Sequence, residues 1–122
     1  MNEKIRVIVA DDEALVRAAL VKMVNSRPDM EAVAEAASGP QAVRSAQTQR
    51  SDVVLMDVRM PGRDGVSVLV DSGAPPPPVV LMTAYAMEER LREAREARVH
   101  AVVQKPFAAP YLLQVLATAV AA

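Results

Sequence analysis

The chain has 122 residues, of which 52% are apolar and none is cysteine, and its formal net charge is −1. This length and composition fit one domain over residues 1–122 with its own hydrophobic core, and the lack of cysteine excludes disulfides and thiolate metal sites. The near-neutral charge gives no basis for direct nucleic-acid binding, and without a membrane-length apolar run or a signal-peptide pattern we expect a cytoplasmic protein.

The first strand and helix are predicted close to the N-terminus. KIRVIVA (4–10) is a continuous apolar run rich in β-branched residues, which is typical of a buried strand. Apolar side chains then recur at the spacing of one helix face: Val16, Ala19, Leu20, Met23 and Val24. This helix should end before Arg27, because Pro28 follows directly.

The second strand and helix are predicted between residues 30 and 46. MEAVAEA (30–36) alternates in part, which indicates an edge strand. The segment that follows has the pattern of a capping box, with Ser38 as the N-cap and Gln41 reaching back to the backbone. The helix that starts there should extend through Val43 and Ala46.

Three more strands are predicted in the rest of the chain, at 52–56, 78–82 and 100–104. The prolines of 73–78 should end a short third helix, and 87–98 reads as a charged helix with a thin apolar stripe. A last helix after Pro110 is marked by Leu112, Leu113, Leu116 and Val120. Because strands alternate with helices five times, we predict an α/β fold with a parallel sheet covered on both faces.

Polar residues follow the predicted strands at their carboxyl ends. Asp11 and Asp12 follow the first strand, Asp57 ends the third, Thr83 the fourth and Lys105 the fifth. In an open parallel sheet these ends lie on one edge, where ligands bind. Carboxylates gathered there repel one another unless a cation neutralises them, and a few hard oxygen ligands suit Mg²⁺. We therefore predict a magnesium site beside a lysine and a hydroxyl.

Each of these residues also has a simpler interpretation when it is taken alone. Asp12 and Thr83 could be helix N-caps. Asp57 could belong to a turn before Met60, and Lys105 could be a solvated strand end. The joint pattern is more specific than any of its members.

Four motifs of the chain resemble those of the receiver domain of two-component response regulators: VADDE, DVVLMDVRMPGRDG, VVLMTAY and VVQKPF. The resemblance covers essentially the whole chain and implies a flavodoxin-like (βα)5 three-layer sandwich, with a five-stranded parallel sheet of order 2-1-3-4-5. It also implies that Asp57 is the phosphoacceptor, which takes a phosphoryl group from a sensor histidine kinase or a phosphotransfer protein. On this view the chain is a signalling protein that assists its own phosphotransfer and dephosphorylation.

The resemblance implies roles for the other site residues as well. The Mg²⁺ ligands would be Asp11, Asp12, Asp57 and the backbone carbonyl of Arg59, and the residues that contact the phosphoryl group would be Thr83 and Lys105. The peptide bond before Pro106 should be cis. Arg59 and Tyr85 should tune the lifetime of the phosphorylated state. Val102 stands where the family usually has an aromatic switch residue, so Tyr85 or a backbone shift would have to replace that switch.

The expected output surface is formed by the helix at 87–98, the fifth strand and the last helix. Expected partners, besides the kinase, are an effector domain or downstream protein and, on activation, a second copy of the chain, although no motif specifies the dimer. The chain stands alone or is the N-terminal part of a longer regulator.

Two other kinds of function compete with this interpretation. The first is a receiver-like interaction module that works without phosphorylation, which Val102 favours and the intact set of acids opposes. The second is a catalytic or nucleotide-binding α/β domain. A hydrolase of the haloacid-dehalogenase type would need a second acid two residues after Asp57, where Arg59 stands, and no glycine-rich phosphate-binding motif occurs.

Overall fold

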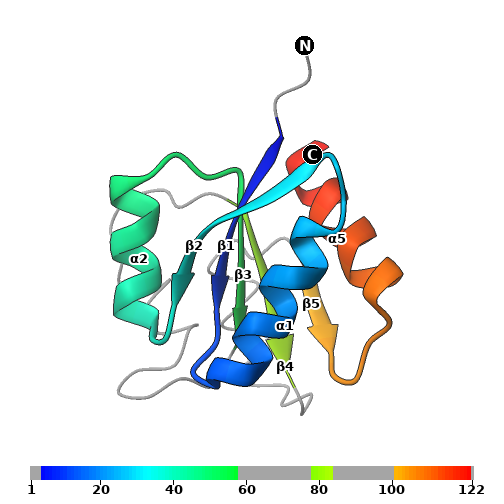
Figure 1. The fold of residues 1–122 in the computed structure, drawn as a ribbon, viewed down its shortest axis with the longest axis horizontal. Coiled ribbons are helices and arrows are strands. Elements are labelled where there is room, and N and C mark those ends of the chain that lie inside the picture. The colour runs from blue at the N-terminus through cyan, green and yellow to red at the C-terminus, as the bar shows by residue number, and fades with distance from the viewer. Residues whose placement is uncertain (1–3, 58–77, 84–100, 122) are drawn as a thin grey trace.

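The computed structural model describes residues 4–57, 78–83 and 101–121 (Figure 1). Their helices and strands are β1 (Ile5–Ala10), α1 (Ala14–Asn25), β2 (Met30–Ala36), α2 (Gly39–Thr48), β3 (Val53–Asp57), β4 (Val79–Thr83), β5 (Ala101–Gln104) and α5 (Ala109–Ala121). The five predicted strands are confirmed, each within one residue of its expected start. The short third helix predicted just before residue 73 and the helix predicted at 87–98 lie outside the described residues, as do Arg59 and Tyr85.

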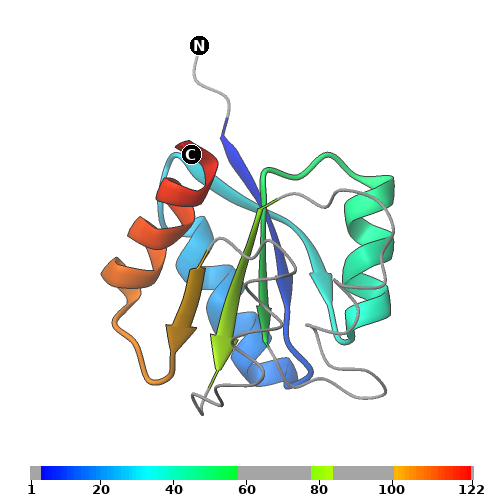
Figure 2. The same ribbon diagram turned by 180° about the vertical axis from the view of Figure 1, so that it is seen from behind.

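The five strands form one sheet in the order β2-β1-β3-β4-β5, and every neighbouring pair is parallel. This is the strand order that the sequence led us to expect. The chain leaves β1 toward β2 on one side and returns to β3 on the other, so the order reverses between β1 and β3 (Figures 1 and 2). Ligands in open α/β sheets bind outside the carboxyl ends of the strands at such a reversal.

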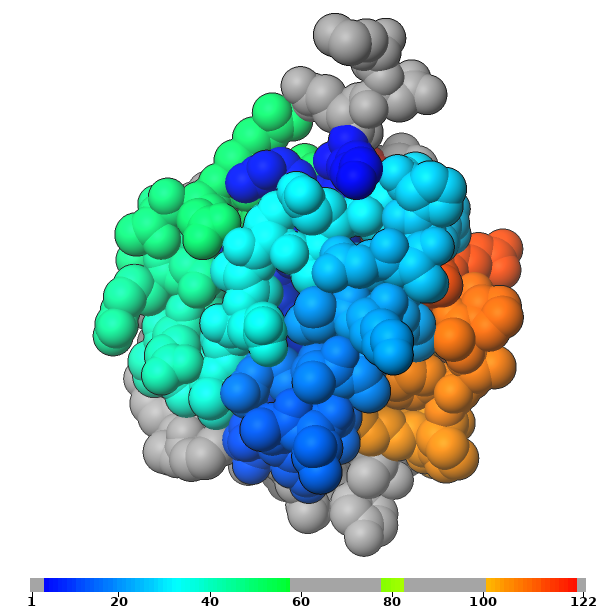
Figure 3. Space-filling model, viewed as in Figure 1, coloured from blue at the N-terminus to red at the C-terminus, as the bar shows by residue number. Residues whose placement is uncertain are grey.

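Alternate residues of the central strands face two separate hydrophobic layers, so the strands are buried on both sides. Val7 and Val9 of β1 pack with α1 and α5, whereas Ile8 and Ala10 of the same strand pack with α2. In the space-filling view α1 and the β5–α5 segment, in blue and orange, lie side by side on the first face (Figure 3). This arrangement explains why β1 and β3 read as continuous apolar runs rather than as alternating ones.

The buried faces of α1 and α5 differ in two positions from those that the periodicity predicted. In α1 the buried line runs through Leu20 and Val24, with Val21 packed beside it, and Ala19 is exposed. The face is therefore rotated away from Ala19. In α5 Ala119 is buried, while Val120, one residue further along the final turn, is exposed.

The start of α2 confirms the predicted N-cap and corrects one of its hydrogen bonds. Ser38 Oγ accepts a hydrogen bond from the backbone N–H of Gln41 at 3.3 Å. Gln41 Oε1 accepts from the N–H of Ala37 at 2.9 Å rather than from that of Ser38. The side chain thus reaches one residue past the N-cap and satisfies the donor just before the helix.

Among the helices of the described ranges, none has the length and apolar character needed to cross a bilayer.

Candidate functional site

The ends of four strands bring the predicted site residues to one edge of the sheet. Strand pairing aligns Ala10 with Met56, Asp57 with Met82 and Thr83 with Gln104. The ends of the strands therefore bring four residues next to one another: Asp11, Asp57, Thr83 and Lys105. In sequence, 94 positions separate the first of them from the last. The parallel topology is what makes distant residues neighbours here.

Asp11 is the most buried charged residue of the described chain, with 1% of its surface exposed. Its backbone N–H donates to the carbonyl of Ala36 at 3.0 Å. Its Oδ1 accepts from the N–H of Glu13 at 2.9 Å, whereas Oδ2 is buried and has no hydrogen-bond partner among the described residues. A buried carboxylate oxygen without a donor is costly, so this atom calls for a cation.

Lys105 lies between two of the carboxylates. Its Nζ donates to Asp57 Oδ2 at 2.7 Å and is 3.7 Å from Asp11 Oδ2. The side chains of Asp57 and Lys105 are 13% and 28% exposed, so the pair is partly shielded from solvent. The peptide bond between Lys105 and Pro106 is cis, as expected at this position.

Asp12 completes a group of three carboxylates that could hold a metal ion. One carboxylate oxygen from each of Asp11, Asp12 and Asp57 lies within 4.8 Å of the others. Asp12 itself is exposed, and the N-cap of α1 is Glu13, whose side chain makes no capping bond. Asp12 is therefore not the helix cap, and the simpler interpretation of this residue is wrong. A hard divalent cation fits the donor set, which offers oxygen atoms and an unpartnered buried one among them.

The pKa values of two site residues, Asp11 and Lys105, are shifted by burial and by the charges around them. Burial raises the pKa of the Asp11 carboxyl above its usual value, helped by the nearby charge of Asp57, although the Glu13 N–H and Lys105 lower it. Burial alone would lower the pKa of Lys105, but its hydrogen bond to Asp57 and the surrounding carboxylates raise that pKa overall. A bound cation would favour the ionised carboxylates and compete with the ammonium for them.

The remaining predicted residues are placed only in part. Thr83 ends β4, with its backbone opposite Gln104. Val102 lies in β5 opposite Leu81 and is half-buried against the layer that contains Ile8. Val102 thus offers no aromatic ring at the position where the resemblance implied a switch residue.

Sequence reasoning missed one residue that touches the site, Arg17 of α1. Its Nη1 donates to the backbone carbonyl of Asp11 at 2.8 Å, and its Nε donates to Glu35 of β2 at 3.3 Å. Nothing in the sequence pattern marks it, since an arginine between apolar helical positions is ordinary on a helix surface.

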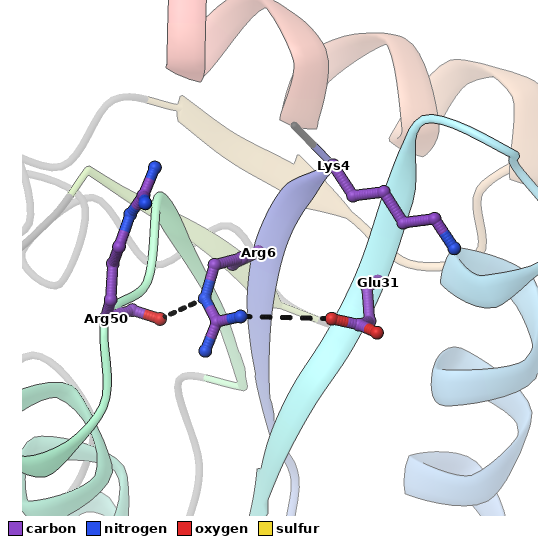
Figure 4. Close-up of a pocket in the computed structure, with 4 residues that line it drawn as sticks. All are labelled: Lys4, Arg6, Glu31 and Arg50. Carbon is purple, nitrogen blue, oxygen red and sulfur yellow. Dashed lines mark hydrogen bonds and ion pairs between the residues drawn. The ribbon is translucent and has the colours of Figure 1, made fainter. Parts of the chain in front are cut away.

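A hollow of about 270 Å³ lies at the opposite end of the sheet and is distinct from this site (Figure 4). Its lining residues are Lys4, Arg6, Glu31 and Arg50, which lie at or just before the amino ends of β1, β2 and β3. The guanidinium of Arg6 joins the carbonyl of Arg50 at 2.7 Å to the carboxylate of Glu31 at 3.9 Å. Charges of both signs thus meet at this end.

Comparisons with known proteins agree with this geometry. A family model described as the response regulator receiver domain matches residues 7–117. Among curated proteins, the transcriptional regulatory protein PdtaR of Mycobacterium tuberculosis is 36% identical over 116 residues, which cover 94% of this chain and 56% of PdtaR. A protein-glutamate methylesterase/protein-glutamine glutaminase of Rhodopseudomonas palustris is 38% identical over 109 residues, or 30% of its length. The chain thus spans about half or less of these relatives.

Solved structures match over nearly the whole chain. The response regulator domain of Thermotoga maritima CheB has a TM-score of 0.88 and 29% identity, with 98% of both chains covered. The receiver domain of the putative response regulator NarL from Mycobacterium tuberculosis has a TM-score of 0.87 and 29% identity, covering 96% of this chain and 97% of that one.

Proposed function

The chain belongs to the response regulator receiver domain family of two-component signalling, and from this premise we propose that it is a phosphorylation-activated switch with Asp57 as phosphoacceptor. The phosphoryl donor would be a sensor histidine kinase or a phosphotransfer protein. The same proposal includes a cytoplasmic location, an effector domain or downstream protein that reads the switch, and dimerisation on activation. The receiver unit would span residues 1–122.

The observation that carries the proposal is the arrangement around Asp57. A rigid strand buried on both faces ends at this carboxylate, which receives a hydrogen bond from Lys105. Asp11 Oδ2 lies buried beside the same ammonium, and no described residue donates a hydrogen bond to it. A site with these contacts can neutralise the charge of a phosphoryl group while it holds the nucleophile in place.

Mg²⁺ is the cofactor that these residues would hold, through Asp11, Asp12, Asp57 and the backbone carbonyl of Arg59. When bound, the ion would neutralise phosphoryl charge and lower the mutual repulsion of the carboxylates. Two observations support this: one carboxylate oxygen from each aspartate lies within 4.8 Å of the others, and Asp11 Oδ2 is buried without a hydrogen-bond partner among the described residues.

In the reaction, a carboxylate oxygen of Asp57 forms a bond to phosphorus as the bond from phosphorus to the donor's imidazole nitrogen breaks. The attacking carboxylate oxygen supplies its own lone pair, so the step needs no general base. Lys105 would neutralise the added charge; the supporting observation is that its ammonium lies 2.7 Å from Asp57 Oδ2. The product is an acyl phosphate, and the electron pair of the broken bond leaves on the imidazole.

Four residues would shape the conformational signal and its lifetime. Thr83 would donate its hydroxyl to a phosphoryl oxygen that exists only in the modified state, which is the differential contact that a switch requires. Tyr85 and Arg59 would flank the path of attacking water and set the phosphoryl lifetime. Because Val102 is aliphatic, the output change would be a shift of backbone and helices around β5 and α5.

The proposed function is tested by the intact mass of the chain after incubation with acetyl phosphate and Mg²⁺. We expect a gain of one phosphoryl group that is lost with EDTA, lost in Asp57→Asn and removed by hydroxylamine. A gain that persists in Asp57→Asn would assign the phosphoacceptor elsewhere.

Val102 favours one alternative, a receiver-shaped module that binds its partner without phosphorylation. That alternative predicts that Asp57→Asn leaves partner binding unchanged. The switch predicts that partner affinity differs between phosphorylated wild type and Asp57→Asn. Measuring both affinities with the purified partner kinase or downstream protein separates the two functions.

A further inference from the structure

Arg17 links the acid-bearing segment after β1 to the edge strand β2. It lies one turn into α1, and its side chain is 20% exposed. The guanidinium makes two bonds at once, from Nη1 to the carbonyl of Asp11 at 2.8 Å and from Nε to Oε1 of Glu35 at 3.3 Å. One side chain thus spans a strand end, a helix and a neighbouring strand.

The contact completes the hydrogen bonding of Asp11. Its N–H is held by Ala36, its carbonyl by Arg17 and its Oδ1 by the N–H of Glu13. Among the described residues, Oδ2 alone of these atoms finds no hydrogen-bond partner, and it is the oxygen that faces Lys105. Asp11 is therefore fixed in orientation, with a single buried oxygen turned toward the acid cluster.

The same contact also sets the position of the next residue. A peptide group is planar, so holding the carbonyl oxygen of Asp11 fixes the plane from which the Asp12 backbone continues. Asp12 is exposed and precedes the N-cap Glu13, so the course of its backbone toward the cluster starts from this plane. The last two residues of β2 brace the segment together: Ala36 bonds Asp11 directly, and Glu35 acts through Arg17.

We infer that Arg17, braced by Glu35, is a positioning residue that holds Asp11 and Asp12 in the geometry for divalent-cation binding; the inference rests on the proposed metal site. Arg17 is not itself a ligand, because its guanidinium carries the same sign of charge as the cation. That charge gives the inference a distinctive sign. If Arg17 acted only through its charge, removing it would strengthen cation binding, whereas a positioning role predicts weaker binding.

The test is calorimetric titration of the full chain with Mg²⁺ at constant ionic strength, together with urea unfolding in EDTA. We expect Arg17→Met to raise the Kd for Mg²⁺ about tenfold, the usual size of effect for residues that orient ligands. Arg17→Lys should also weaken binding, since an ammonium cannot reproduce the planar two-sided contact. Lys22→Met removes the same charge at the far end of α1 and should leave the Kd unchanged.

Glu35 supplies a second, independent pair of variants that leaves α1 intact. Glu35→Gln keeps an oxygen that accepts from Arg17, and Glu35→Ala does not, while both remove the same charge. We expect the Kd of Glu35→Ala to exceed that of Glu35→Gln about threefold. This comparison decides the matter if Arg17→Met does not fold.

Several results would overturn the inference. An Arg17→Met variant that binds Mg²⁺ as well as wild type, or more tightly, would do so, even if its free energy of unfolding were lower. Equal Kd values for the two Glu35 variants would do the same. If wild type bound no Mg²⁺, the proposed metal site would fail along with the role of Arg17, which distinguishes the two failures.

Discussion

The two ends of the sheet differ in how far their charged residues are paired. At the amino end, Arg6 is surrounded by acceptors: its side chain contacts Glu31 and the carbonyl of Arg50, and its backbone N–H donates to Asp52 at 2.9 Å (Figure 4). At the carboxyl end, three carboxylates gather and the ammonium of Lys105 contacts two of them, Asp11 and Asp57. A buried oxygen of Asp11 has no hydrogen-bond donor among the described residues.

This difference separates residues that stabilise the fold from residues kept for chemistry. Charges that satisfy one another add a little to stability and need no ligand. Charges of one sign gathered in a partly buried place lower stability until something binds. Departures from local satisfaction of this kind are typical of functional sites. The contrast predicts that substitutions at the carboxyl end change binding and phosphoryl transfer, whereas those at the amino end change stability alone.

The largest effect is expected for Lys105→Met. Loss of the ammonium should lower the rate of phosphoryl uptake by Asp57 about 100-fold, because a charge-stabilising donor is removed. The same variant should bind Mg²⁺ more tightly, since the ammonium no longer competes for the carboxylates. Intact mass against time and calorimetry would measure the two changes. Unaltered uptake would remove Lys105 from the mechanism.

Asp12→Asn should weaken Mg²⁺ binding by about tenfold or more, because it removes a ligand oxygen charge from the cluster. Its free energy of unfolding in EDTA should be unchanged or slightly higher, since a mutual repulsion is removed. Glu31→Gln, at the opposite end of the sheet, also removes one carboxylate charge; it is the matched control and should retain the wild-type affinity. A fall in stability without a change in affinity would place Asp12 among the structural residues.

At the amino end, Asp52→Ala should lower the free energy of unfolding by about 1 kcal/mol, because the backbone N–H of Arg6 loses its acceptor. Asp52→Asn keeps an acceptor oxygen and should lose less. Urea unfolding checks both variants, and neither should change the Kd for Mg²⁺. A changed Kd would mean that the two ends of the sheet are coupled.

The smallest effect is expected for Glu31→Gln. The carboxylate lies 3.9 Å from Arg6 Nη1 and is about half exposed, so the pair should contribute less than about 0.5 kcal/mol. Urea unfolding at low and high salt would measure it. A loss well above that value would show that Glu31 stabilises this end of the sheet more than its distance from Arg6 indicates.

The sheet could be predicted from the sequence because its strands are buried on both faces and therefore read as continuous apolar runs. Placing Asp11, Asp57 and Lys105 on one edge followed from the parallel topology alone. The strand order and the cis bond before Pro106 came from resemblance to a family, and the structure agrees with both.

The sequence could not predict which of two neighbouring residues is buried and which is exposed to solvent. Asp11 and Asp12 are chemically identical and adjacent, yet the first is buried and the second is exposed. Ala19 and Val120 lie at the margins of their helix faces, where a pattern of apolar residues cannot say which side chain meets the sheet. Arg17 was missed because its partners are a backbone carbonyl and a residue 18 positions away.

The most direct test of the difference between the two ends of the sheet is a titration of the isotope-labelled chain with Mg²⁺. The amide chemical shifts are measured by NMR at each Mg²⁺ concentration. The account predicts saturable shifts at Asp11, Asp12 and Asp57 and at the neighbours of Lys105, with none at Arg6, Arg50 or Asp52. Shifts of equal size at both ends, or none at the carboxyl end with Mg²⁺ in large excess, would contradict the claim that this end of the sheet is a cation site.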